Sequence, residues 1–240
     1  MKNPLTTTAS LAALIFAAPC VSQAATIITP TGSTSTVAAD AGTSALAVIN
    51  GSGLSATVTT GSDTATALGV THGNGTLSQS YVTNDPGAVG GDYYAQGGVT
   101  PVFTYTLGST FNDVDSIVLW NYSQTAAGSP SNNSLQTFSL QFFSDAGATT
   151  QIGGTLTGLT ITRSLITPQT AQQVFFGAGV DFDGVQSVKM TLTDNYFGAG
   201  GGGGGDRVGF SEVRFSQVPE PSAALLGSLG ALALLRRRRA

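Results

Sequence analysis

Runs of β-branched and aromatic residues in the second half of the chain constrain its fold more than any other feature. Apolar and polar residues alternate along these runs, and glycine, asparagine, aspartate and proline separate them. The six clearest runs are 101–107, 115–122, 135–143, 172–176, 185–192 and 208–215. Alternation places the apolar side chains on one face of an extended chain. The runs therefore predict six antiparallel strands in a β-sandwich, with a jelly roll as the leading architecture.

The first half of the body is rich in threonine, serine, glycine and alanine, which predicts short strands and long loops. No window of the body has a capped helical period of apolar residues. Trp120 alternates with Val118 in its run, and we expect its indole to fill the sandwich core. Because both ends of the 240 residues are processing segments, we expect an all-β chain with a single domain at 25–217.

The charge of the body excludes a nucleic-acid surface. Residues 25–218 carry 4 basic and 12 acidic side chains, a net charge of about −8. Cys20 is the single cysteine and lies in the N-terminal segment, so the body can form neither a disulfide nor a thiolate metal site.

Residues 1–24 have the pattern of a cleavable signal peptide, with Lys2 before an apolar helical stretch. Ser22 and Ala24 supply small side chains at the two positions that signal peptidase reads. A lipoprotein signal is the weaker reading, because Pro19 occupies the position before Cys20 where a small residue is needed. The pattern predicts export.

Residues 218–240 contain a Pro-Glu-Pro motif, an apolar run at 223–235 and a basic end. The motif and the basic end comprise Pro219, Glu220, Pro221, Arg236, Arg237, Arg238 and Arg239. A helix of 13 residues rises about 20 Å, which is less than the roughly 30 Å hydrocarbon core, so it suits a transient anchor. Arginines stay on the cytoplasmic side, which leaves the body outside the inner membrane.

This tail resembles the PEP-CTERM family of exported bacterial proteins. The resemblance implies that an exosortase recognises Pro219, Glu220 and Pro221 and cuts the tail at a bond that the sequence does not identify. It also implies a tether in the inner membrane before processing, and then a place at the cell surface or in the extracellular matrix. A plain tail anchor is the alternative.

Residues 101–215 contain a strand near I-V-L-W-N and a closing E-V-R-F strand. With these two strands the segment resembles discoidin-like, galactose-binding-like domains. It implies that a ligand, where there is one, meets the loops at one end of the barrel. It also implies a structural calcium ion in many members.

The loop before the last predicted strand is the first candidate for ligand contact, because Asn195, Tyr196 and Arg207 stand beside six consecutive glycines. Aromatic faces stack on sugars, and amide or guanidinium groups bond hydroxyls. Asn121 and Tyr122, at the end of another strand, are further candidates. The alternative is a disordered glycine loop, since ordering costs about 1–2 kcal/mol per residue.

Two aspartate pairs are candidate ligands for a structural calcium ion: Asp113 with Asp115, and Asp181 with Asp183. A calcium ion needs roughly six to eight oxygen ligands, of which each aspartate pair would supply only a part. The alternative is that these aspartates form turns, since aspartate is a common turn residue and no complete calcium-loop motif is present. No other cofactor is expected.

The sequence offers few candidate catalytic side chains, because His72 is the only histidine and Glu212 is the only glutamate before the tail. We expect a non-enzymatic, carbohydrate-associated or exopolysaccharide-associated surface module. The alternatives are a structural or adhesive surface protein without a small ligand and, third, a secreted hydrolase that would need a cleft with a perturbed carboxylate.

Overall fold

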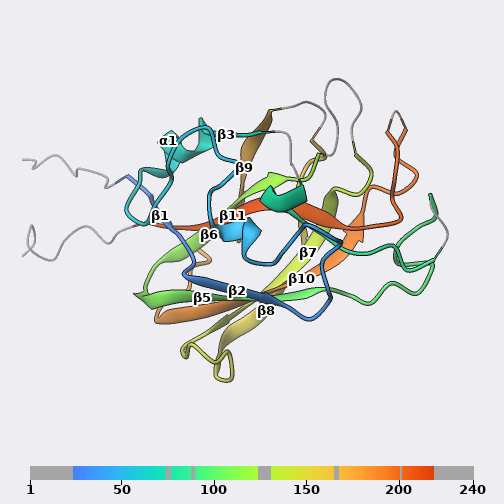
Figure 1. Cartoon of the computed structure of the whole chain (residues 1–240). Helices are drawn as coiled ribbons and strands as arrows, with labels where there is room; N and C mark the ends of the chain where they lie inside the picture. Colours follow the sequence, from blue (N-terminus) through green and yellow to red (C-terminus); the bar gives the residue numbers. More distant parts are fainter. Residues whose placement is uncertain are drawn as a thin grey trace, which may run out of the picture.

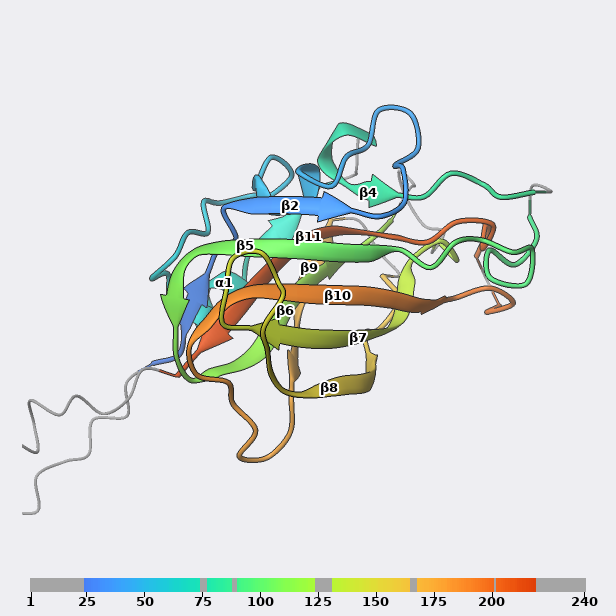
Figure 2. The ribbon, with the colours of Figure 1, turned by 90° about the horizontal axis from the view of Figure 1, so that it is seen from below.

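Two antiparallel sheets face each other across one core (Figures 1 and 2). The computed structural model describes residues 24–73, 77–87, 90–123, 131–164, 168–200 and 202–218. The β11 sheet has the order β1-β11-β6-β9-β3, with β4 also paired to β11, and the β10 sheet has the order β2-β5-β10-β7-β8. The predicted antiparallel β-sandwich is confirmed. The predicted signal helix and C-terminal apolar helix lie outside the described residues.

All six predicted strands are present, together with short strands in the first half and one strand, β8, that the sequence pattern did not indicate. The strands are β1 (Thr26–Ile28), β2 (Gly32–Ser35), β3 (Thr71–His72), β4 (Tyr81–Val82), β5 (Val102–Phe111), β6 (Val114–Asn121), β7 (Leu135–Phe143), β8 (Gln151–Thr160), β9 (Gln169–Phe175), β10 (Val185–Asn195) and β11 (Gly209–Gln217). The helices are η1 (Ala47–Ile49), α1 (Thr64–Leu68) and η2 (Leu77–Gln79). None of the described helices is long and apolar enough to cross a membrane.

The core between the sheets follows from alternation along the strands. In β5, Phe103, Tyr105 and Leu107 point inward and are buried, while the threonines between them are only partly buried. Phe103 meets Tyr81 edge to face, with ring centroids 4.6 Å apart. Aromatic packing of this kind stabilises a body that has no cysteine for a disulfide.

The outer face of the β11 sheet is covered as well. The segment 50–73, which includes α1, lies over it and closes a second apolar cluster that contains Val118 and Trp120. Trp120 is fully buried there, and its Nε1 donates to Val70 O at 2.8 Å. The expectation that the indole fills the core between the sheets is therefore wrong, because its side of β6 faces the covering segment.

The two ends of the sandwich differ in the segments that lie there: the chain ends at one and a group of loops at the other. Thr26 pairs with Gln217 at the end of β11, so both ends of the described chain leave from one side, which we call the terminal end. The opposite side, which we call the loop end, comprises residues 90–101, 131–134, 161–164, 196–200 and 202–208 (Figure 2). The nine residues of β11 separate the two ends by roughly 26 Å.

Candidate functional site at the loop end

Asn195, the last residue of β10, holds both ends of the glycine-rich loop. Its side chain is buried, and its Nδ2 donates to the carbonyl oxygens of Gly205 and Arg207, each at 2.7 Å. Its Oδ1 accepts from Phe197 N at 3.0 Å. One amide therefore draws the first and the last residues of the loop together.

Two asparagines before β7 hold the middle of the loop. Asn132 N donates to Gly203 O at 2.8 Å, and Tyr196 N donates to Asn132 O at 3.1 Å. Asn133 Oδ1 accepts from the amide of Gly205. The described part of the loop is thus hydrogen-bonded to its surroundings, which answers the alternative of a disordered glycine loop for those residues.

Arg163 joins the loop to the segment after β8. Its Nη2 donates to Gly200 O at 2.9 Å, and its Nη1 donates to Asn132 Oδ1. Its guanidinium lies over the Tyr196 ring, 5.7 Å from the centroid. The Tyr196 hydroxyl donates to Ile161 O at 2.6 Å, and burial raises its pKa. These contacts make a rigid platform of one ring and one cation.

Arg207 forms an ion pair with Asp40 at the other side of the loop, and the two side chains are 29% and 20% exposed. Tyr122 lies within the electrostatic influence of this pair. Burial raises the pKa of Tyr122 to about 12, which Arg207 partly opposes. The Tyr122 phenol therefore remains protonated and buried in the protein.

The surface of the loop end presents apolar groups beside these polar ones. Phe197 is 46% exposed and Val99 67% exposed. Gly205 has a φ of +113°, and a Cβ there would stand 2.6 Å from Phe197 Cδ2. Only glycine lets the phenylalanine ring lie against this part of the loop.

The five ligand residues predicted from sequence gather at this end but are not equivalent. Asn121 is fully buried and its Nδ2 donates to Leu135 O and Thr162 O, so it joins strands rather than facing solvent. Asn195 and Tyr122 are buried as well, whereas Tyr196 and Arg207 keep partly exposed side chains.

Sequence reasoning missed the two residues that anchor the loop, Arg163 and Asn132. The available signals were that Arg163 is one of four cations in the body and that a Ser-Asn-Asn-Ser turn precedes the run 135–143. Neither signal shows that Arg163 and Asn132 contact the glycine-rich loop.

The two aspartate pairs meet at the terminal end instead. Asp183 Oδ1 accepts from Asp113 N at 3.0 Å, and burial, with a smaller effect from Asp181, raises the pKa of Asp115. Among the described residues, no group of three or more His, Cys, Asp or Glu side chains is placed to hold a metal ion.

The processing residues predicted at the two ends of the chain are largely outside the described structure. Ser22, Pro219, Glu220, Pro221 and Arg236 to Arg239 lie there, while Ala24 is the first described residue and is exposed. Residues 217–239 match the PEP-CTERM protein-sorting motif. The predicted sorting tail is thereby confirmed, and it indicates an exported protein processed at its C-terminus.

Several solved carbohydrate-binding structures resemble the chain at low identity. A family 32 module from C. perfringens NanJ in complex with galactose is 12% identical, covers 80% of this chain and 99% of its own, and gives a TM-score of 0.42. The lectin domain of Lectinolysin complexed with Lewis B antigen is 15% identical, with coverage of 77% and 90% and a TM-score of 0.42.

A Streptococcus pneumoniae fucose binding module is 12% identical, with coverage of 79% and 96% and a TM-score of 0.40. These scores lie below 0.5, so the fold assignment rests on the two sheets themselves. No curated protein matches the sequence.

Proposed function

We propose that this chain is an exported, non-catalytic carbohydrate-binding module of the cell surface or extracellular matrix, with the loop end as its binding surface. The observation that carries the proposal is the pre-ordered pair of Tyr196 and Arg163, followed in the chain by the exposed ring of Phe197. Rings stack on the C–H faces of sugars, and guanidinium groups bond hydroxyls. Signal peptidase, exosortase and, before cleavage, the inner membrane are its processing partners.

The position of the tail supports this assignment. The sorting motif begins at residue 217, where β11 ends at the terminal end. A chain tethered through that tail would hold its loop end away from the membrane, at roughly the length of β11. A polysaccharide outside the cell would therefore meet the loops first.

The order of the glycine loop also favours binding. A loop that is ordered only on binding loses about 1–2 kcal/mol per residue in backbone entropy. Arg163, Asn132 and Asn195 already hold the described part of this loop, so a sugar would not have to order it. The only histidine, His72, is fully buried and away from this surface, which fits a non-catalytic role.

Replacing Phe197 by alanine should weaken glycan binding about five- to tenfold, because it removes an exposed stacking ring worth about 1–1.4 kcal/mol. The measurement is a glycan array of the full-length chain, with and without calcium ions, followed by titration of the best glycan. Phe175→Ala is the matched control, since Phe175 is 60% exposed on β9 and lies toward the terminal end.

An equal loss in both variants would contradict a site at the loop end. Background signal for the unaltered chain on every glycan would favour the structural or adhesive surface protein instead.

A further inference from the structure

A polar pocket lies on the opposite side of β11 from the sandwich core, beneath the covering segment. It has a volume of about 360 Å³, which is within the roughly 300–1,000 Å³ of ligand sites. Its lining includes Asn50, Thr57, Thr59 and Arg214. The loop-end site shares none of these residues.

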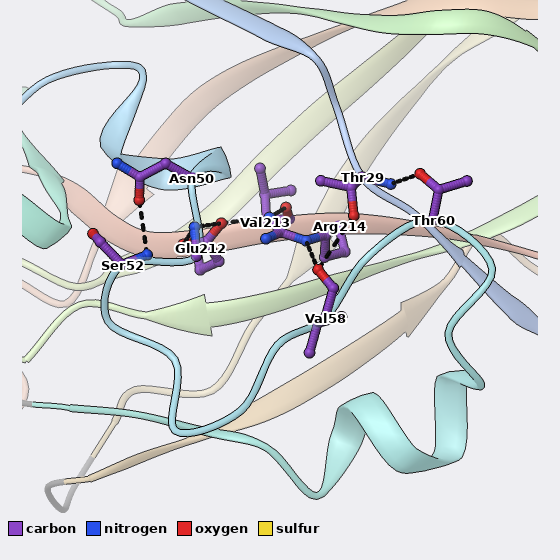
Figure 3. A network of polar contacts seen from close by, with 9 residues as sticks. Thr29, Asn50, Ser52, Val58, Thr60, Glu212, Val213 and Arg214 are labelled. Atoms are coloured by element: carbon purple, nitrogen blue, oxygen red, sulfur yellow. Dashed lines mark hydrogen bonds and ion pairs between the residues drawn. The ribbon is translucent and has the colours of Figure 1, made fainter.

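Arg214 is buried, with a side chain that is 2% exposed, and most of its donors are used (Figure 3). Its Nη1 donates to Val213 O at 2.7 Å and to the Glu212 carboxylate, and its Nε donates to Val58 O at 3.5 Å. Its Nη2 lies 3.5 Å from the position that a Cβ on Gly51 would take, beside the pocket wall. Because Gly51 has no side chain, no Cβ lies against Nη2 at this position, although the guanidinium as a whole is almost fully buried.

Glu212 is fully buried beside the same guanidinium and also accepts from Gly51 N at 3.2 Å (Figure 3). Burial raises the pKa of Glu212 to about 7, an effect that Arg214 and the Gly51 amide only partly oppose. The charge of the Arg214–Glu212 pair therefore changes from about zero above neutral pH to about +1 below it.

Other ionisable groups near this pair do not charge over the same range. Tyr105, on β5, is within the electrostatic influence of Glu212, and burial raises its pKa well above the usual value. His72, on β3, is fully buried behind Gly53, and burial lowers its pKa. Both are neutral near pH 7, so the pair governs the charge of the pocket.

We propose that this pocket binds a small acidic sugar, a hexuronate, whose carboxylate accepts from Arg214 Nη2. A hydrogen bond from a charged guanidinium N–H to a carboxylate is stronger than one between neutral groups. The Thr57 and Thr59 hydroxyls and the Asn50 amide provide partners for sugar hydroxyls. The net charge of the body is strongly negative, so recognition depends on this local cation rather than on a general attraction for anions.

Calorimetric titration of the full-length chain with sodium glucuronate tests the proposal, with glucose as the neutral probe. We expect glucuronate to bind about tenfold more tightly near pH 6 than near pH 8.5, since protonation of Glu212 releases the charge of Arg214. Glucose should bind at least about tenfold more weakly than glucuronate near pH 6.

Two variants separate recognition from damage to the fold. Glu212→Gln keeps the shape of the pair and removes its negative charge, so binding near pH 8.5 should become about tenfold tighter and almost independent of pH. Thr57→Trp should block the pocket and abolish binding, while Thr193→Trp, also at an exposed threonine but on β10, should not.

Glucuronate binding that survives Thr57→Trp, or that Glu212→Gln weakens near pH 8.5, would overturn the proposal. Absence of glucuronate binding near pH 6 would overturn it as well. Because the loop end shares no residue with the pocket, Phe197→Ala should leave glucuronate binding unchanged, and the two sites can fail separately.

Discussion

Replacing Arg214 by methionine should lower the free energy of unfolding by about 3–5 kcal/mol near pH 8. The side chain is 2% exposed (Figure 3). Its removal leaves Glu212 buried without an opposing charge, so the carboxyl group must either stay ionised unpaired or take up a proton well above its usual pKa, and both cost stability. Unfolding in urea, followed by circular dichroism, measures the loss. Near pH 5 the loss should be smaller, because Glu212 is then largely protonated.

Arg207→Met is the matched control for this prediction. It also removes one arginine from one ion pair, but the Arg207 side chain is 29% exposed and its partner Asp40 is 20% exposed. Pairs in contact with solvent are worth about 0–1 kcal/mol. Equal losses in the two variants would show that burial of the Arg214–Glu212 pair has no special cost. Adding Glu212→Gln to Arg214→Met should recover part of the stability near pH 8.

The stability of the protein should also fall as the pH rises from about 4.5 through 7, by about 3 kcal/mol. The cause is Glu212, whose pKa is raised by burial from 4.5 to about 7. Because the folded state binds this proton more tightly than the unfolded state, the stabilisation is complete below the usual pKa. It is lost as the pH rises through the folded pKa.

Thermal or urea unfolding of the unaltered chain and of Glu212→Gln, compared at each pH, isolates this effect. His72 acts in the opposite direction, since burial lowers its pKa and its contribution is lost as the pH falls. The difference between the two proteins removes this background. Parallel stability profiles would contradict the prediction.

Strand β8 shows where pattern reading fails in this chain. It is an edge strand, paired only with β7, and most of its residues are exposed. The β7–β8 register shifts twice, and Gly153 and Gly158 have positive φ angles, so apolar residues do not alternate along it. The threonine- and glycine-rich sequence of β8 therefore predicts a loop, although its backbone forms the edge strand of the β10 sheet.

Trp120 shows a second kind of failure. Burial of this residue was predictable from its run of apolar residues, and the structure confirms it. The side of the sheet that it faces was not predictable, because β6 is apolar on both faces and a separate segment covers the outer one. Alternation distinguishes two faces only when one of them meets water.

Local patterns by themselves determined six strands of the second half, all except β8, and the sorting tail. Both depend on the order of neighbouring residues: period-two alternation for a strand, and motif, apolar run and basic end for the tail. Only the tertiary structure decided the sites. Arg163 meets Asn132 and Gly200, and Gly51 meets Glu212, across segments far apart in sequence. Sheet packing brings these groups together, and no local pattern encodes the loop geometry that aligns them.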